Sequence, residues 1–165
     1  MKLPVSLGLA LFVLVLDFIT KRWVESALFH GQQIALTSFF NLVLAYNAGA
    51  AFSFLSDAAG WQRWFFSAIA AGASILIVYL LRKHAAERLF CIALGLILGG
   101  ALGNLWDRIT LGHVVDFLDF HAGGYHWPAF NVADSAIFLG AMLLILDSFR
   151  QKGSDTENLA KRKNG

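Results

Sequence analysis

The sequence predicts an all-α polytopic membrane protein with four transmembrane helices, and two observations support this fold class. Of the 165 residues, 58% are hydrophobic and only 15% are charged, and the mean hydropathy is +0.62. Soluble domains carry about 25% charged residues, so this chain lacks the polar surface of a water-soluble globule. In addition, four apolar stretches approach the length of about 20 residues that a helix needs to cross a bilayer.

The four stretches cover residues 3–19, 64–81, 89–106 and 132–149. Because Lys2 precedes the first stretch, a cleaved signal peptide is an alternative there, but no Ala-x-Ala site follows and three further spans favour a retained helix. In the third stretch Gly95, Gly99 and Gly103 are spaced by four residues, which places them on one helix face and allows another helix to approach closely.

Basic residues are distributed unequally between the two sides of the predicted membrane. Nine of the 13 Lys and Arg residues fall on the side that carries both termini, and four fall on the other side. The positive-inside rule therefore places both termini in the cytoplasm. The same distribution accounts for the net charge of +2 without a nucleic-acid partner.

Two loops on the predicted outer side have strand-like patterns. Residues 34–46 are rich in Ile, Phe, Val and Leu, a turn signal follows at residues 47–49, and residues 51–55 are expected to form a return strand. Residues 114–118 form the second pattern. We therefore expect a small extracytoplasmic β element within a single membrane domain, residues 1–150, followed by a polar cytoplasmic tail without regular structure, residues 151–165.

Other protein classes are excluded by composition. The single cysteine, Cys91, excludes a disulfide scaffold and is expected to be a small apolar filler of the third span. The high hydrophobic content excludes a disordered chain.

Ionisable residues within or beside membrane spans are costly and mark functional sites. The predicted topology brings most such residues of this chain to the outer face of the membrane. They are Asp17, Lys21, Asn47, Asn104, Asp107, Arg108, Asp116, Asn131 and Asp134. A site at the outer interface is therefore expected.

Structural roles explain part of this set. Asp17 and Lys21 are spaced as an i, i+4 ion pair that orients the first helix. Asn131 is placed as a helix N-cap. Arg108 is equally compatible with a site residue and with a side chain that reaches from the helix to the interface.

Asp116 and Asp134 are the two carboxylates that structural roles explain least well. If they face each other, they cannot both ionise cheaply, so they are expected to share a proton. The ionised carboxylate then acts as a general base for water, and the protonated one polarises a carbonyl and protonates the leaving amine. The pair therefore suggests peptide hydrolysis.

Two alternatives use overlapping residues. A membrane metallopeptidase would draw its ligands from a group of His and Asp residues in the loop between the third and fourth apolar stretches. That group is His113, Asp116, Asp119, His121 and His126, but no His-Glu-x-x-His motif is present. A small proton- or ion-coupled transporter would relay protons through the polar cluster, but transporter sites lie near the bilayer midplane and the chain has no repeated half.

Five short blocks carry a resemblance to a known family. In chain order they are DFITK (17–21), NAGAAFS (47–53), GGALGNLWDR (99–108), VVDF (114–117) and FNVADS (130–135). With these blocks the chain resembles the lipoprotein signal peptidases, or signal peptidase II, which are bacterial membrane aspartyl peptidases. The resemblance extends over about residues 17–149.

The resemblance implies an enzyme of the bacterial inner membrane with four spans, a small outer β element and a short interfacial helix. The implied reaction is removal of the signal peptide from prolipoproteins, before a diacylglyceryl-modified cysteine. Asp116 and Asp134 are implied to be catalytic. Residues implied to bind substrate or to support the site are Asp17, Lys21, Asn47, Gly100, Asn104, Arg108, Asn131 and Ala133.

The same resemblance implies neither a metal nor an organic cofactor. The expected partners are lipid-modified prolipoproteins and membrane lipid, and the chain is expected to act as a monomer with its active site near the periplasmic face. The acyl chains of the substrate are expected to stay in lipid, while apolar residues such as Phe52 and Phe54 offer a sheltering loop at the site.

Overall fold

The computed structural model of the chain describes residues 3–49 and 60–163, with side chains to residue 150. Its four long helices are α1 (Leu3–Ala27), α2 (Trp61–Lys83), α3 (Arg88–Thr110) and α4 (Val132–Lys163). Each contains an 18-residue window with a mean hydropathy between 1.8 and 2.2, and is long enough to cross a membrane. The prediction of a helical, polytopic membrane protein is therefore confirmed.

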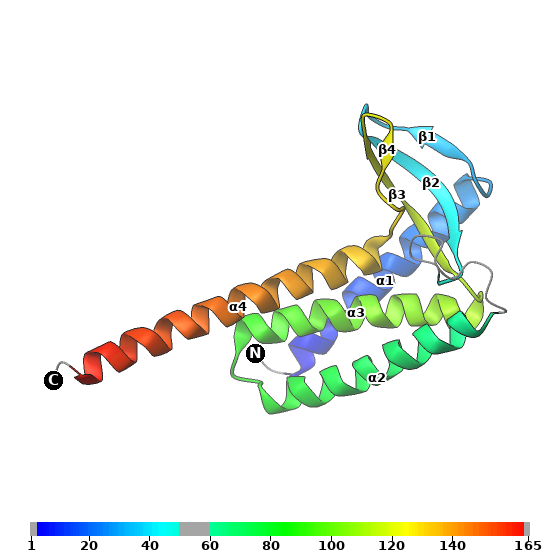
Figure 1. Cartoon of the computed structure of the whole chain (residues 1–165). Helices are drawn as coiled ribbons and strands as arrows, with labels where there is room; N and C mark the ends of the chain where they lie inside the picture. Colours follow the sequence, from blue (N-terminus) through cyan, green and yellow to red (C-terminus); the bar gives the residue numbers. More distant parts are fainter. Residues whose placement is uncertain (1–2, 50–59, 164–165) are drawn as a thin grey trace.

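Helix α3 is the central helix of the bundle. It lies between α2 and α4, with α1 packed behind it (Figure 1). Of its apolar window 56% is buried, against 17–22% in the other three helices. The remaining helices expose large side chains such as Phe12, Ile75 and Phe138, as expected for surfaces that face lipid.

Glycines allow this close packing around α3. A Cβ atom added at Gly99 would lie 2.6 Å from the carbonyl oxygen of Ala10 on α1, and one at Gly95 would lie 3.0 Å from that of Ser6. On the next face, Gly100 lies directly against the backbone of Ala133 on α4. The predicted glycine face is thus confirmed as the contact with α1, and Gly100 makes the contact with α4.

A four-stranded antiparallel sheet stands at one end of the bundle (Figure 1). Its strands are β1 (Gln33–Ala35), β2 (Phe40–Asn47), β3 (Val114–Ala122) and β4 (Tyr125–His126), in that spatial order. The strand-like run 34–46 is therefore two strands, because the chain turns at Thr37, whose backbone N–H donates to the carbonyl of Phe40. The two loops pair through β2 and β3.

Some expected elements fall elsewhere. The return strand predicted at residues 51–55, with Phe52 and Phe54, lies outside the described residues. In the part of the chain that is described, no element is a short interfacial helix. Where the sequence predicts a tail without regular structure, the backbone of α4 continues as a helix to Lys163, beyond the end of the bundle (Figure 1).

Helix α1 extends further than predicted, to Ala27 rather than to residue 19. The reason is a second apolar core at the sheet end. Val24 of α1 and the following Leu28 are buried there against Leu44, Val115 and Phe117 of the sheet. The last turns of α1 therefore support β2 and β3 from below, and β3 is held directly over the ends of α1 and α3.

Replacement of Gly99 by alanine tests the close contact between α1 and α3. The added Cβ would lie 2.6 Å from both the Ala10 oxygen and the Val13 Cβ, so we expect a loss of about 1–3 kcal/mol in stability. The control is Gly72→Ala, because a Cβ at Gly72 meets nothing within 4 Å. Thermal unfolding in detergent should show a lower midpoint for Gly99→Ala alone; equal midpoints for the two variants would contradict the packing described.

Candidate active site

The first turn of α4 positions Asp134 through a reciprocal cap. The side-chain oxygen of Asn131 accepts a hydrogen bond from the backbone N–H of Asp134 at 2.9 Å. In return, the backbone N–H of Asn131 donates to Oδ2 of Asp134 at 3.3 Å. This is the capping-box pattern, with an asparagine and an aspartate in the two positions. The predicted N-cap role of Asn131 is confirmed, and the cap leaves Oδ1 of Asp134 for other partners.

Asp116 lies on β3 and is nearly fully buried, with 3% of its surface exposed. Its two carboxylate oxygens each accept one amide hydrogen bond, from Nδ2 of Asn131 at 2.7 Å and from Nδ2 of Asn47 at 3.0 Å. Burial, followed by the negative charge of Asp134, raises the pKa of Asp116 to about 7, against the smaller opposing effect of the two amides. Its protonated and ionised forms are therefore balanced near neutral pH.

Two asparagine side chains connect the carboxylates. Asn131 contacts both of them, as the cap of Asp134 and as a donor to Asp116. Asn104 of α3 donates from Nδ2 to Oδ1 of Asp134 at 2.7 Å, and its own oxygen accepts from Asn131 at 3.3 Å. The carboxylates from β3 and α4 thus belong to one hydrogen-bonded group.

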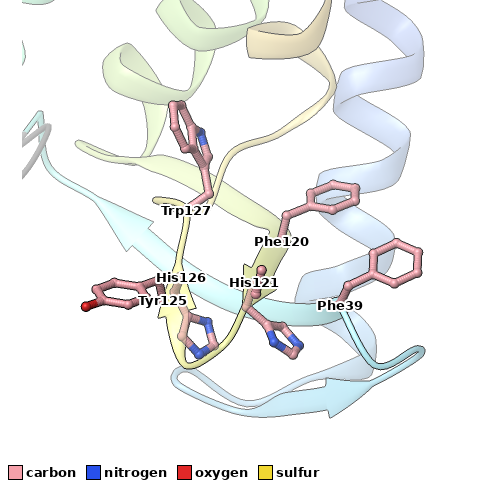
Figure 2. A pocket seen from close by; sticks show the side chains of 7 residues that line it. Phe39, Phe120, His121, Tyr125, His126 and Trp127 are labelled. Carbon is pink, nitrogen blue, oxygen red and sulfur yellow. The ribbon is translucent and has the colours of Figure 1, made fainter.

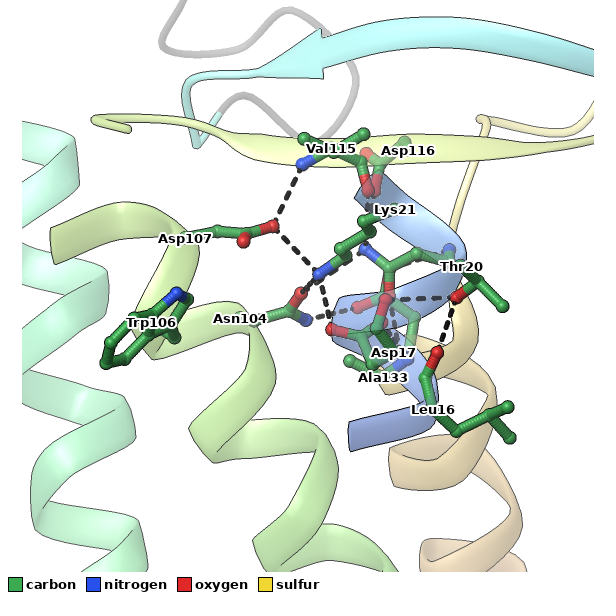
Figure 3. Close-up of polar contacts among 12 residues, drawn as sticks. Leu16, Asp17, Thr20, Lys21, Asn104, Trp106, Asp107, Val115, Asp116 and Ala133 are labelled. Atoms are coloured by element: carbon green, nitrogen blue, oxygen red, sulfur yellow. Dashed lines mark hydrogen bonds and ion pairs between the residues drawn. The ribbon is translucent and has the colours of Figure 1, made fainter. Parts of the chain in front are cut away.

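A buried ion cluster adjoins this group through Asn104, and Figure 3 shows it below Asp116. Nζ of Lys21 lies 2.7 Å from Oδ2 of Asp17, 2.9 Å from Oδ2 of Asp107 and 3.1 Å from Oδ1 of Asn104. Lys21, Asp17 and Asp107 are each at most 2% exposed. The predicted pair of Asp17 and Lys21 is present, and Asp107 is its third member.

Two further predicted residues lie at the contact between α3 and α4. Gly100 is placed against the backbone of Ala133, and Ala133 is fully buried. The backbone N–H of Ala133 donates to Oδ1 of Asp17 at 2.9 Å. Within the described residues, Gly100 therefore makes a packing contact with Ala133, and Ala133 donates a backbone hydrogen bond to Asp17.

Arg108 ends the polar row on α3. Its Nη1 donates to the carbonyl oxygen of Asn104 at 3.3 Å, and its guanidinium carbon lies 5.4 Å from the ring centre of Phe66 on α2. Its charge interacts with the charges of both Asp134 and Asp116. This position brings its positive charge near both carboxylates, and a role for Arg108 in the site stays a prediction.

Two hollows share Trp127 in their walls, and Asp134 lines one of them. One, of about 450 Å³, is lined by Asp134 and by the apolar side chains Trp127, Phe130, Phe138 and Leu139, with Ser135 between them. The second, of about 350 Å³, lies at the tip of the sheet among aromatic and imidazole side chains, and Trp127 borders both (Figure 2). Asp134 is therefore the charged group at the edge of an apolar groove.

The residues of the metal alternative are dispersed. His126 contacts Asp119 at 2.9 Å and stacks on His121. At the other end of β3, the ring of His113 lies 4.2 Å from that of Tyr46 and is tilted against it by 43°. Within the described residues, no group of three or more His, Cys, Asp or Glu side chains is arranged to hold a metal ion. Asp119 is instead hydrogen-bonded to Asn41. It lies on the opposite side of β3 from the amides that bind Asp116 and Asp134.

No role for Asp107 is predicted from the sequence, and the structure places this residue in the ion cluster. Its position three residues after Asn104 indicated a shared helix face. That face alone did not distinguish a contact with α1 from exposure at the end of α3.

Comparisons with known proteins show the family to which the chain belongs. A family model for signal peptidase (SPase) II matches residues 9–150. The lipoprotein signal peptidase of Janthinobacterium sp. (strain Marseille) is 59% identical over 147 residues, which are 89% of each chain. That of Ralstonia nicotianae is 58% identical over 145 residues, 88% of this chain and 84% of the relative.

Solved structures extend the similarity to the fold. A bacterial membrane enzyme determined at 2.3 Å resolution superposes with a TM-score of 0.81 and 33% identity, over 92% of this chain and 91% of that one. A second, at 1.9 Å, has a TM-score of 0.77 and 34% identity, over 87% and 92% of the two chains. With a family model that spans most of its length, relatives this similar and the four-helix membrane fold, the chain belongs to the signal peptidase II family of membrane peptidases.

Proposed function

We propose that this chain is an aspartic endopeptidase that removes the signal peptide of prolipoproteins by hydrolysing the bond before a diacylglyceryl-modified cysteine. The relatives named lipoprotein signal peptidase support the substrate class. The observation that carries the aspartic mechanism is the hydrogen-bonded group in which Asn131 contacts both Asp116 and Asp134. The alternatives, a metallopeptidase and a transporter, are supported neither by the relatives nor by the family model.

In this mechanism the two carboxylates share one proton and act in turn. The ionised carboxylate takes a proton from a water molecule, whose oxygen attacks the scissile carbonyl carbon. The protonated carboxylate gives its proton to the carbonyl oxygen. As the tetrahedral intermediate collapses, the amide nitrogen takes the proton from the first carboxylate, the C–N bond breaks, and the second carboxylate recovers its proton.

The neighbouring side chains suit these steps. Asn47, Asn104 and Asn131 are neutral donors, so they hold the carboxylates in place without enforcing the ionised state of both. Arg108 adds a positive charge on the same side, which favours the negative charge that develops on the carbonyl oxygen during attack.

The apolar groove beside Asp134 suits a lipid-modified substrate. Phe138 and Leu139 line it and are largely exposed on the outer surface of α4, where acyl chains in the bilayer would reach them. The positive-inside rule supports an orientation with both termini in the cytoplasm and this end of the bundle at the outer face of the inner membrane. Because one chain supplies both carboxylates and the groove, we propose that it acts as a monomer.

Substitution of either carboxylate tests the mechanism. Asp116→Asn and Asp134→Asn should each reduce cleavage of a lipidated prolipoprotein by about 10⁴-fold or more, because neither variant can share a proton between two carboxylates. The matched control is Asp119→Asn, a buried carboxylate on the same strand that is hydrogen-bonded to Asn41 and His126. It should retain cleavage. Full activity of either Asp116→Asn or Asp134→Asn in correctly inserted protein would refute the assignment.

The pH dependence follows from the raised pKa of Asp116. Above about pH 7 this carboxyl ionises, so both members of the pair become charged and the acid is lost. We therefore expect kcat/KM to fall as the pH rises through about 7. In Asn47→Ala the fall should move to higher pH, because the Asn47 amide favours the ionised form of Asp116. A profile that rises through this range would contradict the shared proton.

Treatment with a chelator separates the aspartic mechanism from the metal alternative. Cleavage of a lipidated prolipoprotein by the purified protein should continue at an unchanged rate in excess EDTA, because the two carboxylates supply both the base and the acid. A known zinc peptidase, assayed under the same conditions, controls for effective chelation. Loss of cleavage that added zinc restores would replace the aspartic mechanism by the metal one.

A further inference from the structure

The buried ion cluster touches the backbone at two equivalent points. Oδ1 of Asp17 accepts the N–H of Ala133 at 2.9 Å, and Oδ2 of Asp107 accepts the N–H of Val115 at 3.2 Å. Ala133 immediately precedes Asp134, and Val115 immediately precedes Asp116. Each carboxylate of the cluster therefore holds the backbone N–H of the residue before one member of the pair, and Lys21 bridges the two carboxylates (Figure 3).

A third contact runs through Asn104. The ammonium of Lys21 is a donor only, so Asn104 presents its oxygen to Lys21 at 3.1 Å and its amide nitrogen to Asp134. Lys21 thereby fixes which end of the Asn104 amide faces the carboxylate. In total, three connections lead from one buried cation to the α4 and β3 segments that carry Asp134 and Asp116.

We propose that the cluster is a positioning device, and that Asp107 is a positioning residue in it alongside Asp17 and Lys21. This inference rests on the proposed aspartic mechanism and deepens it. The start of α4 also contacts β3 directly, through Asn131 and through the pairing of Phe130 with Leu118. The cluster adds a second restraint on the separation of the two carboxylates, because it holds the N–H groups of the residues before both of them from one point between α1 and α3.

Two variants at Asp107 distinguish this role from simple charge pairing. Both Asp107→Asn and Asp107→Ala remove the negative charge that faces Lys21, but only Asn keeps an oxygen to accept the Val115 N–H. We expect Asp107→Asn to keep kcat within about 5-fold of wild type, and Asp107→Ala to lose about 100-fold in kcat, as for a misplacement of about 1 Å, with little change in KM.

The pH profile gives a readout that reduced stability alone would not change. When β3 is released in Asp107→Ala, Asp116 moves toward water and away from Asp134, and both causes of its raised pKa weaken. The fall in kcat should then begin at lower pH than in wild type or in Asp107→Asn. The control is Glu25→Ala, which removes an ion pair of 2.8 Å with Arg22 on the same helix as Lys21 but releases no backbone N–H held by the cluster. Its kcat and pH profile should be unchanged.

The possible outcomes are all decisive when kcat is normalised to folded protein. Equal kcat for the Asn and Ala variants, whether both normal or both impaired, would overturn the proposal. If Asp107→Ala does not fold, Asp17→Ala tests the Ala133 N–H instead, and normal kcat in that folded variant overturns the proposal. An inactive, folded Asp107→Asn variant also overturns it. Wild-type cleavage with inactive Asp116→Asn shows that the proposed function stands, so a failure here then concerns the positioning role alone.

Discussion

The interior of this bundle is organised around one buried cation. An ammonium group without a counter-charge is too costly to bury in a low-dielectric interior, so Lys21 requires partners at hydrogen-bond distance. It has three, Asp17, Asp107 and Asn104, drawn from α1 and α3. The two carboxylates in turn use their remaining capacity on backbone N–H groups of α4 and β3. Satisfying one charge thus joins four elements of the fold.

Glycines make this arrangement sterically possible. A Cβ at Gly103 would lie 2.6 Å from Oδ2 of Asp17, the oxygen that pairs with Lys21, and Gly100 lies against the backbone of Ala133. Larger residues at these positions would separate α3 from α1 and α4 and remove the ion cluster from reach. The small residues of α3 therefore contribute to the chemistry indirectly, by allowing polar side chains on three helices to meet.

Much of the fold was predictable because it depends on local sequence. Length and hydropathy identify the four spans, and Asn131 with Asp134 identifies the cap of α4, since both are properties of neighbouring residues. The convergence of Asp116 and Asp134 followed from topology. The pairing of β2 with β3 did not, because it joins residues about 70 positions apart, as in the contact of Asn47 with Asp116. The extension of α1 to Ala27 and the place of Asp107 likewise depend on tertiary contacts.

Lys21 lies close to Asp116 and Asp134, a pair that must retain a proton. This is possible because its charge is paired with a different set of carboxylates, Asp17 and Asp107. Within the described residues, no Lys or Arg makes an ion pair with Asp116 or Asp134, whose direct partners are neutral amides and backbone groups. Lys21 is already paired with Asp17 and Asp107. Its charge lowers the pKa of Asp116 by less than either amide does, and by less than burial or the charge of Asp134 raises it. If Lys21 contacted Asp116 directly, it would favour the ionised form and remove the acid at neutral pH. The ion pairs of the cluster therefore hold the backbone beside the two carboxylates in place, while the amide contacts leave the catalytic pair free to share its proton.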